Sequence, residues 1–297
     1  MTSTGTTLQG SITSGSAQTY TGGVTLGTNV SLNAGATNAI TLGVVNGAAK
    51  DLTTTGLTNI TSTSTALGAL TVNQTLTTAG AIAAANVNVI GATTLGGNVT
   101  TTGNQTYNQP ATLSAPVVLA STNSGDITLN GASGAQTLTV NTAGNTALSG
   151  TYSNTSVTTD APGSVGLNMG ASSTAAFTIG DSIISGTTTV NNGLTFSNAV
   201  TLNGTTNLTS STGITFLSTV NSDATPRALT VNGPATFQGA VGATKALLSV
   251  TVSGGTTSLG GNVTTNGAVG QTYAGVTLSA TPIVLDAGVA KIGRAHV

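Results

Sequence analysis

Several residue types that most proteins rely on are missing or scarce in this chain. It has no Cys and no Trp, its six acidic residues are all Asp, and charged residues make up 4% of its 297 positions, where about 25% is usual. Without Cys there can be no disulfide and no thiolate metal centre. Five Lys and Arg are too few to neutralise a nucleic-acid backbone, so we expect no nucleic-acid partner. No apolar run reaches the roughly 18 residues of a membrane-spanning helix.

The residues that are abundant favour β-structure. Thr accounts for roughly a fifth of the chain, far above ordinary usage, and there are 41 Gly. Disordered chains combine low hydrophobicity with high net charge, whereas this chain is 38% hydrophobic with a net charge of −1. Such a composition predicts a neutral scaffold, without catalysis and without a cofactor.

The two ends of the sequence do not look like natural ends. The start, Met1 to Thr7, has neither the basic nor the apolar region of a secretion signal. At the other end, Ile292 to Val297 resembles the translated read-through of a sequencing adapter. We therefore expect residues 291–297 to be a non-native tail and the chain to be a fragment of a longer protein.

Internal repeats extend over almost the whole sequence. Residues 8–32 match residues 95–119 without a gap after a shift of 87, and the match includes the word Gln-Thr-Tyr, which recurs a third time at residues 271–273. Aromatic residues mark four copies, at spacings of 87, 89 and 77 residues. These predicted structural anchors are Tyr20, Tyr107, Phe196 and Tyr273. We expect all four to be buried and to occupy equivalent places on their coils.

The commonest short motif is a tripeptide in which Thr lies between two apolar residues. A period of two predicts a strand with one buried face, so Thr25, Thr128 and Thr139 should point outward. Asn-Gly and Gly-Gly pairs separate these strands at the positions of tight turns. Because stacked coils tend to share a sequence pattern, we predict an all-β fold, a parallel β-helix (β-solenoid) of roughly 20 residues per coil. The super-repeat near 87 residues would hold four coils, and residues 1–290 would form a single domain.

At this point the pattern resembles a known class. The resemblance rests on four sequence motifs: residues 95–101, Leu-Gly-Gly-Asn-Val-Thr-Thr, followed by Gln105 to Tyr107, Gly125 to Leu129 and Leu138 to Asn141. They are similar to the β-strand-repeat regions of filamentous-haemagglutinin-like adhesins and other giant bacterial surface exoproteins. The resemblance implies a right-handed parallel β-helix in a secreted protein on the bacterial cell surface, associated with the outer membrane through parts of the parent outside this sequence. It also implies adhesion to a host or neighbouring-cell surface or to carbohydrate. Blunt solenoid ends would permit end-to-end self-association.

The carboxylates are the first place to look for a chemical site. The six Asp are Asp51, Asp126, Asp160, Asp181, Asp223 and Asp286. Acid–base catalysis needs two groups in one site with separated pKa values, and with one His, in the tail, we expect none. A calcium ion shared by two Asp is the alternative.

Three other features allow competing interpretations. Four Asn-x-Ser/Thr words, at Asn29, Asn98, Asn207 and Asn262, match the glycosylation signal but follow from composition. The aromatic anchors could form a carbohydrate-stacking stripe if exposed, although a core position is expected. A self-assembling surface layer and a Thr-ladder ice-binding solenoid are alternative functions. The run of Thr and Ser from Thr61 to Thr65 is the segment that suggests an ice-binding ladder.

Overall fold

The computed structural model describes residues 2–3, 5–159, 163–169, 175–180, 183–288 and 292–293. Within them the chain is all-β, and its parallel strands stack as a β-solenoid with roughly 20 residues per turn, as predicted. The residues form two compact units, residues 1–146 with 153–155 (unit 1) and residues 147–152 with 156–297 (unit 2). Each unit is described by itself, and the expectation of a single domain over residues 1–290 stays a prediction.

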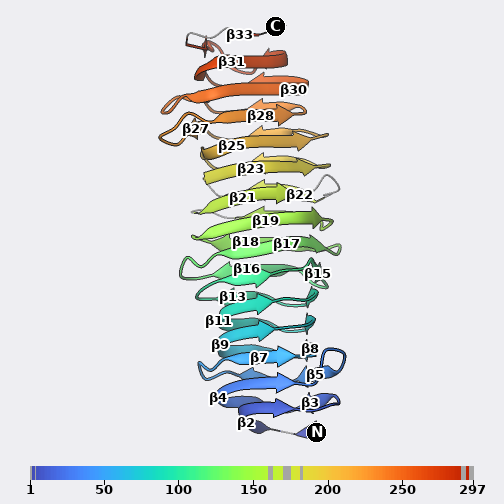
Figure 1. Ribbon diagram of the computed structural model, residues 1–297. Helices are drawn as coiled ribbons and strands as arrows, with labels where there is room; N and C mark the ends of the chain where they lie inside the picture. Colours follow the sequence, from blue (N-terminus) through green and yellow to red (C-terminus); the bar gives the residue numbers. More distant parts are fainter. Residues whose placement is uncertain are drawn as a thin grey trace. The chain divides into compact units, whose positions relative to one another are not determined.

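Unit 1, blue to green in Figure 1, has three strand ladders, here named faces A, B and C. Face A contains β1 (Thr2–Ser3), β3 (Gln18–Tyr20), β5 (Ala39–Leu42), β8 (Leu57–Ile60), β10 (Leu76–Thr78), β12 (Thr93–Leu95), β15 (Ala111–Leu113) and the end of β17 (Ile127–Ser133). Face B contains the first parts of β2 (Thr6–Thr13), β4 (Val24–Asn33), β9 (Ser64–Val72) and β11 (Ile82–Val89), with β6 (Val45–Asn46), β13 (Val99–Thr101), β16 (Val117–Ser121) and β18 (Thr137–Thr142). Face C contains the second parts of β2, β4, β9 and β11, with β7 (Leu52–Thr55), β14 (Gln105–Tyr107) and the start of β17.

Unit 2 repeats this plan, and its three ladders are named faces P, Q and R. Face P contains β20 (Ser156–Thr159), β22 (Ala176–Ile179), β24 (Leu194–Phe196), β26 (Ile214–Phe216), β29 (Ala235–Phe237) and the ends of β30 (Leu247–Leu259) and β31 (Val263–Leu278). Face Q contains β21 (Ser164–Met169), the first parts of β23 (Ile183–Val190), β25 (Val200–Ser210) and β31, with β27 (Val220–Ser222) and β32 (Leu285–Asp286). Face R contains the second parts of β23 and β25, with β28 (Ala228–Asn232), the start of β30, the middle of β31 and β33 (Ile292–Gly293). The remaining strand, β19 (Asn145–Tyr152), has its first two residues in unit 1 and the rest in unit 2.

Alternation explains why these residues form these strands. In the three-residue strands the side chains of the first and third residues are buried and that of the second points outward, as in Leu-Thr-Phe of β24. The inward positions carry Leu, Val, Ile, Phe and Tyr, which together fill the interior of each coil. β-branched and aromatic side chains suit such a pleated surface.

Glycine is required where one coil passes close over the backbone of another. A Cβ placed on Gly97 would lie 2.6 Å from the carbonyl carbon of Gly80 in the preceding coil. Real Cβ atoms do not approach a backbone atom so closely, so the Gly-Gly pair at residues 96–97 follows from the stacking of corners. Gly261, in the second copy of this word, would meet the backbone nitrogen of Ala240 at 2.7 Å.

Candidate functional surfaces

The four predicted aromatic anchors are core residues. Tyr20, Tyr107, Phe196 and Tyr273 are each at most 1% exposed, which confirms that they are buried. The four remaining aromatic side chains of the protein, Tyr152, Phe177, Phe216 and Phe237, are also buried. All eight aromatic residues therefore lie inside the coils, and the interpretation of the anchors as a carbohydrate-stacking stripe is wrong.

The prediction that the anchors occupy equivalent places is also wrong. Tyr20 lies on face A, opposite Leu42, whereas Tyr107 lies on face C, between Val89 and Leu129. In unit 2, Phe196 lies on face P and Tyr273 on face R. The reason is coil length: successive coils on face A advance by 17 to 22 residues. A shift of 87 residues therefore spans four coils and two further faces rather than four whole coils.

What the three Gln-Thr-Tyr words share is a corner, not a face. In each, the Gln side chain is buried, its Oε1 accepts a hydrogen bond from the Tyr hydroxyl two residues later, and its Nε2 donates to main-chain carbonyls of the preceding strand and of the next coil. For Gln105 the main-chain acceptors are the carbonyls of Val99 at 3.2 Å and Ala120 at 2.8 Å, and Thr101 Oγ1 also accepts from Nε2 at 3.2 Å. Gln18 and Gln271 donate in the same pattern. Burial raises the pKa of the tyrosine hydroxyls, most strongly at Tyr107.

The outward orientation of the single Thr residues is confirmed. Thr25, Thr128 and Thr139 are exposed or half-buried between buried neighbours. Stacking places such residues above one another, so each face carries columns of hydroxyl and amide groups. Thr61 to Thr65, in contrast, do not form a flat ladder: residues 61–63 lie in a corner between β8 and β9, and Ser64 points inward.

The most regular polar surface lies on face C of unit 1, where each of seven coils contributes one residue to each of two outward columns. We name it the paired-column face. Its first column is Ser11, Ser31, Thr53, Thr71, Asn88, Thr106 and Thr128, and its second is Thr13, Asn33, Thr55, Asn73, Ile90, Asn108 and Asn130. All but Ile90 are Ser, Thr or Asn, and none of them is buried.

A shorter surface of the same kind lies on face R of unit 2. Its columns are Thr187, Asn207, Thr230, Thr251 and Thr272, and Thr189, Thr209, Asn232 and Ser253. Sequence analysis missed both surfaces because it looked for Thr-x-Thr within one local word. The signal is a Ser, Thr or Asn at two positions in successive coils, which emerges only once the strand register is known.

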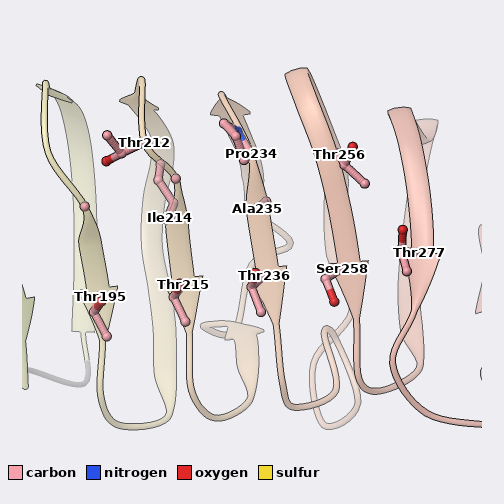
Figure 2. A pocket seen from close by; sticks show the side chains of 12 residues that line it. Thr195, Thr212, Ile214, Thr215, Pro234, Ala235, Thr236, Thr256, Ser258 and Thr277 are labelled. Carbon is pink, nitrogen blue, oxygen red and sulfur yellow. The ribbon is translucent and has the colours of Figure 1, made fainter.

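An open groove of about 390 Å³ runs along face P of unit 2 (Figure 2). One side is a column of hydroxyls, Thr195, Thr215, Thr236, Ser258 and Thr277, which lie in a row across adjacent strands. Gly193 and Gly213 lack side chains two positions before Thr195 and Thr215, and this leaves the groove open. Its lining carries neither a charge nor an aromatic ring.

The carboxylates act as corner caps. Asp51 Oδ1 accepts the main-chain N–H of Ala69 at 2.7 Å, and Asp126 Oδ1 accepts that of Asn145 at 2.9 Å. Asn29, Asn86 and Asn104 occupy the corresponding corner in other coils and make the same bond to the next coil. We name these five residues the cap ladder. The sequence signal for the cap ladder is an Asn or Asp directly before a face C strand, which occurs in five of the seven coils; Gln9 and Ala69 stand there in the other two.

The other carboxylates make local bonds. The Arg227 guanidinium donates two hydrogen bonds to the Asp223 carboxylate, at 2.9 and 2.7 Å, and this holds the pKa of Asp223 below its usual range. Asp286 accepts the N–H of Gly288. Asp160 and Asp181 lie outside the described residues, as does most of the tail predicted at residues 291–297. Across the part of the chain that the structure describes, His, Asp and Glu do not gather in a group of three or more that could hold a metal ion.

Besides Asn29 of the cap ladder, two further asparagines of the glycosylation-like motifs lie at corners of the coils. Asn98 Oδ1 accepts the N–H of Val118 at 2.9 Å, and Asn262 Oδ1 accepts that of Val284 at 2.8 Å. These bonds give the two asparagines a structural role at the corners of the coils.

No family model, no curated protein and no solved structure matches this chain. Among the described residues there is also no helix long and apolar enough to cross a membrane.

Proposed function

We propose that this chain is a structural and adhesive segment of a secreted bacterial surface protein, without catalytic activity. The observation that carries the proposal is the repetition of one uncharged surface chemistry. Hydroxyl and amide side chains recur at the same position in coil after coil, on face C of unit 1 and on faces P and R of unit 2. A surface of this kind suits extended, repeated contact better than recognition of one small molecule.

The arrangement of the carboxylates supports a non-catalytic role. Asp51 and Asp126 are each bonded to the backbone of the following coil, and Asp223 is paired with Arg227. A catalytic site would need a nucleophile, a base and stabilising donors directed at one point. Here the polar groups are instead distributed along columns.

Adhesion through such columns depends on number. Each hydroxyl or amide contact is weak, but contacts that are linked on one rigid body, or on many copies, act together and raise the overall affinity by orders of magnitude. Because the columns carry no charge, binding should also be insensitive to salt. The expected partners are the surface of a host or neighbouring cell, or carbohydrate.

The test compares single molecules with arrays. The full chain is coupled at high density to fluorescent beads, and retention is measured on bacterial cells, on epithelial cells and on immobilised polysaccharides, alongside binding of the free protein. We expect bead retention on at least one surface, little binding of the free protein, and no change between 0.1 and 1 M salt, which differ about threefold in Debye length.

Beads carrying a charged, non-repetitive protein of similar size provide the control for non-specific retention. Retention no greater than that of the control on every surface would overturn the adhesive proposal, and so would release of the beads by salt. Depolymerisation of any of the polysaccharides by the purified chain would overturn its non-catalytic part.

A further inference from the structure

The paired-column face has a two-dimensional order that no other described surface of unit 1 has. Its seven coils are in register, so the groups within a column repeat at the strand spacing of about 4.8 Å. The two columns are two residues apart along each strand, which corresponds to about 7 Å. The result is a two-column array of hydroxyl and amide groups that repeats from coil to coil.

Bonds within the face fix its side chains. Asn73 Nδ2 donates to Thr55 Oγ1 at 3.0 Å, and Asn108 Nδ2 donates to Asn88 Oδ1 at 3.2 Å. The main chain of the second column is also held, because Asn73 N donates to Thr54 O at 2.9 Å. Thr side chains are stiff at χ1 because they are β-branched. A ligand that binds here therefore has little side-chain entropy to remove.

The chemistry of the face limits the ligand. Neither column contains a charged or aromatic residue, so there is nothing to pair with an ionic partner or to stack on a sugar ring. The two carboxylates next to the face, Asp51 and Asp126, accept backbone N–H groups in the cap ladder. The columns instead offer hydroxyls, amides and the methyl groups of Thr, which match an uncharged lattice of hydrogen-bonding groups with a repeat of a few ångströms.

Crystalline water is the partner with that chemistry. We propose that the paired-column face binds the surface of ice. Each outward hydroxyl or amide takes the place of one water at the crystal surface, while the Thr methyl groups lie between these positions. The inference goes beyond the proposed adhesion to cells or carbohydrate, because it assigns this one face to ice. It also gives a role to Ile90, the one apolar member, which is 47% exposed and keeps the face filled without a polar group.

The experiment places a bulky side chain on the face and on a matched control position. Thr71→Tyr changes a half-buried Thr in the middle of the first column, and Thr94→Tyr changes a half-buried Thr in the single column of face A. The full-length proteins are compared by ice-crystal shaping, thermal hysteresis and inhibition of ice recrystallisation. We expect activity in the unaltered protein and in Thr94→Tyr, and loss of activity in Thr71→Tyr.

A second pair of variants keeps the test decisive if a variant of the first pair does not fold. Asn108→Tyr, at an exposed position of the second column, is compared with Thr77→Tyr, at an exposed position of face A. Circular dichroism shows whether each variant retains its strands. Absence of ice shaping by the unaltered protein would overturn the proposal, as would equal loss in folded face C and face A variants. Bead adhesion to cells or polysaccharides without activity on ice would overturn this inference and leave the adhesive function intact.

Discussion

The Gln-Tyr hydrogen bond inside the coils can be tested by a double-mutant cycle at residues 105 and 107. Gln105 and Tyr107 are both fully buried, and the Tyr hydroxyl donates to Gln105 Oε1 at 3.1 Å. The cycle compares Tyr107→Phe, Gln105→Leu and the double variant with the unaltered protein. Phe and Leu fill nearly the same volumes, so the changes remove polar atoms rather than create large cavities.

The expected magnitudes follow from the number of partners. Tyr107→Phe removes one buried bond and leaves Gln105 Oε1 unsatisfied, which should cost about 1–3 kcal/mol. Gln105→Leu also releases the carbonyls of Val99 and Ala120 from the amide. With two to three bonds at about 1–1.5 kcal/mol each, it should cost about 3 kcal/mol. Each single variant leaves one polar group unpaired, either the Gln105 amide oxygen or the Tyr107 hydroxyl, whereas the double variant contains neither group. The loss of stability in the double variant should therefore be smaller than the sum of the two single losses by about 1–2 kcal/mol.

The assay is urea unfolding of the full chain followed by circular dichroism, with the midpoint converted to free energy through a common slope. The same cycle at Gln271 and Tyr273, whose bond is 3.0 Å long, provides an internal repeat. If Tyr107→Phe costs as much in the Gln105→Leu background as in the unaltered protein, the two groups are not coupled, and the corner bond does not contribute to stability as argued.

Three further changes test separate features of the fold. Thr257→Val should stabilise the protein by about 1 kcal/mol or more, because the Thr257 hydroxyl is buried without a hydrogen-bond partner. The control, Thr101→Val, removes a hydroxyl bonded to a carbonyl at 2.6 Å and should destabilise the protein. The reverse order of the two variants in thermal unfolding would refute the argument. Burial raises the pKa of Tyr107 above that of an unfolded tyrosine, about 10. The stabilisation associated with this shift is complete below pH 10 and is lost as the pH rises further. In a pH titration above pH 10, the free energy of unfolding of Tyr107→Phe should therefore fall less steeply than that of the unaltered protein. Finally, Gly97→Ala should cost about 2 kcal/mol through contact with the preceding coil, whereas Gly23→Ala, at an open corner, should be near neutral; equal urea midpoints would contradict the close approach.

The alternation of apolar residues with Thr and the Asn-Gly and Gly-Gly turn motifs are sufficient to predict the class of fold. The apolar-Thr-apolar words became strands with an outward Thr, as at Thr25 and Thr139, because the side-chain period of a strand leaves no other way to bury both neighbours. The burial of every aromatic side chain follows from the same reasoning, since all eight lie inside the coils. These features depend on a few adjacent residues, so local sequence contains them.

The arrangement of the surface could not be predicted in the same way. Whether two outward residues share a column depends on coil length, which varies from 17 to 22 residues on face A. That variation arises at the corners, where a residue can be added without disturbing the strands. The paired-column face and the cap ladder both join residues from different coils, and neither has a fixed period in the sequence.

The corner bond explains how a sequence repeat and a structural repeat can differ. Gln18 follows a corner that leads to face A, and Gln105 follows one that leads to face C, yet both amides bond to the carbonyl of the residue fifteen positions later. The bond requires only a strand before the corner and a coil stacked above it, and every corner of a parallel solenoid supplies both. A duplicated stretch of sequence can therefore fold with the same local contacts on a different face, so its length need not equal a whole number of coils. The outward residues of the copy are then placed on a new face, and the surface columns change while the core remains the same.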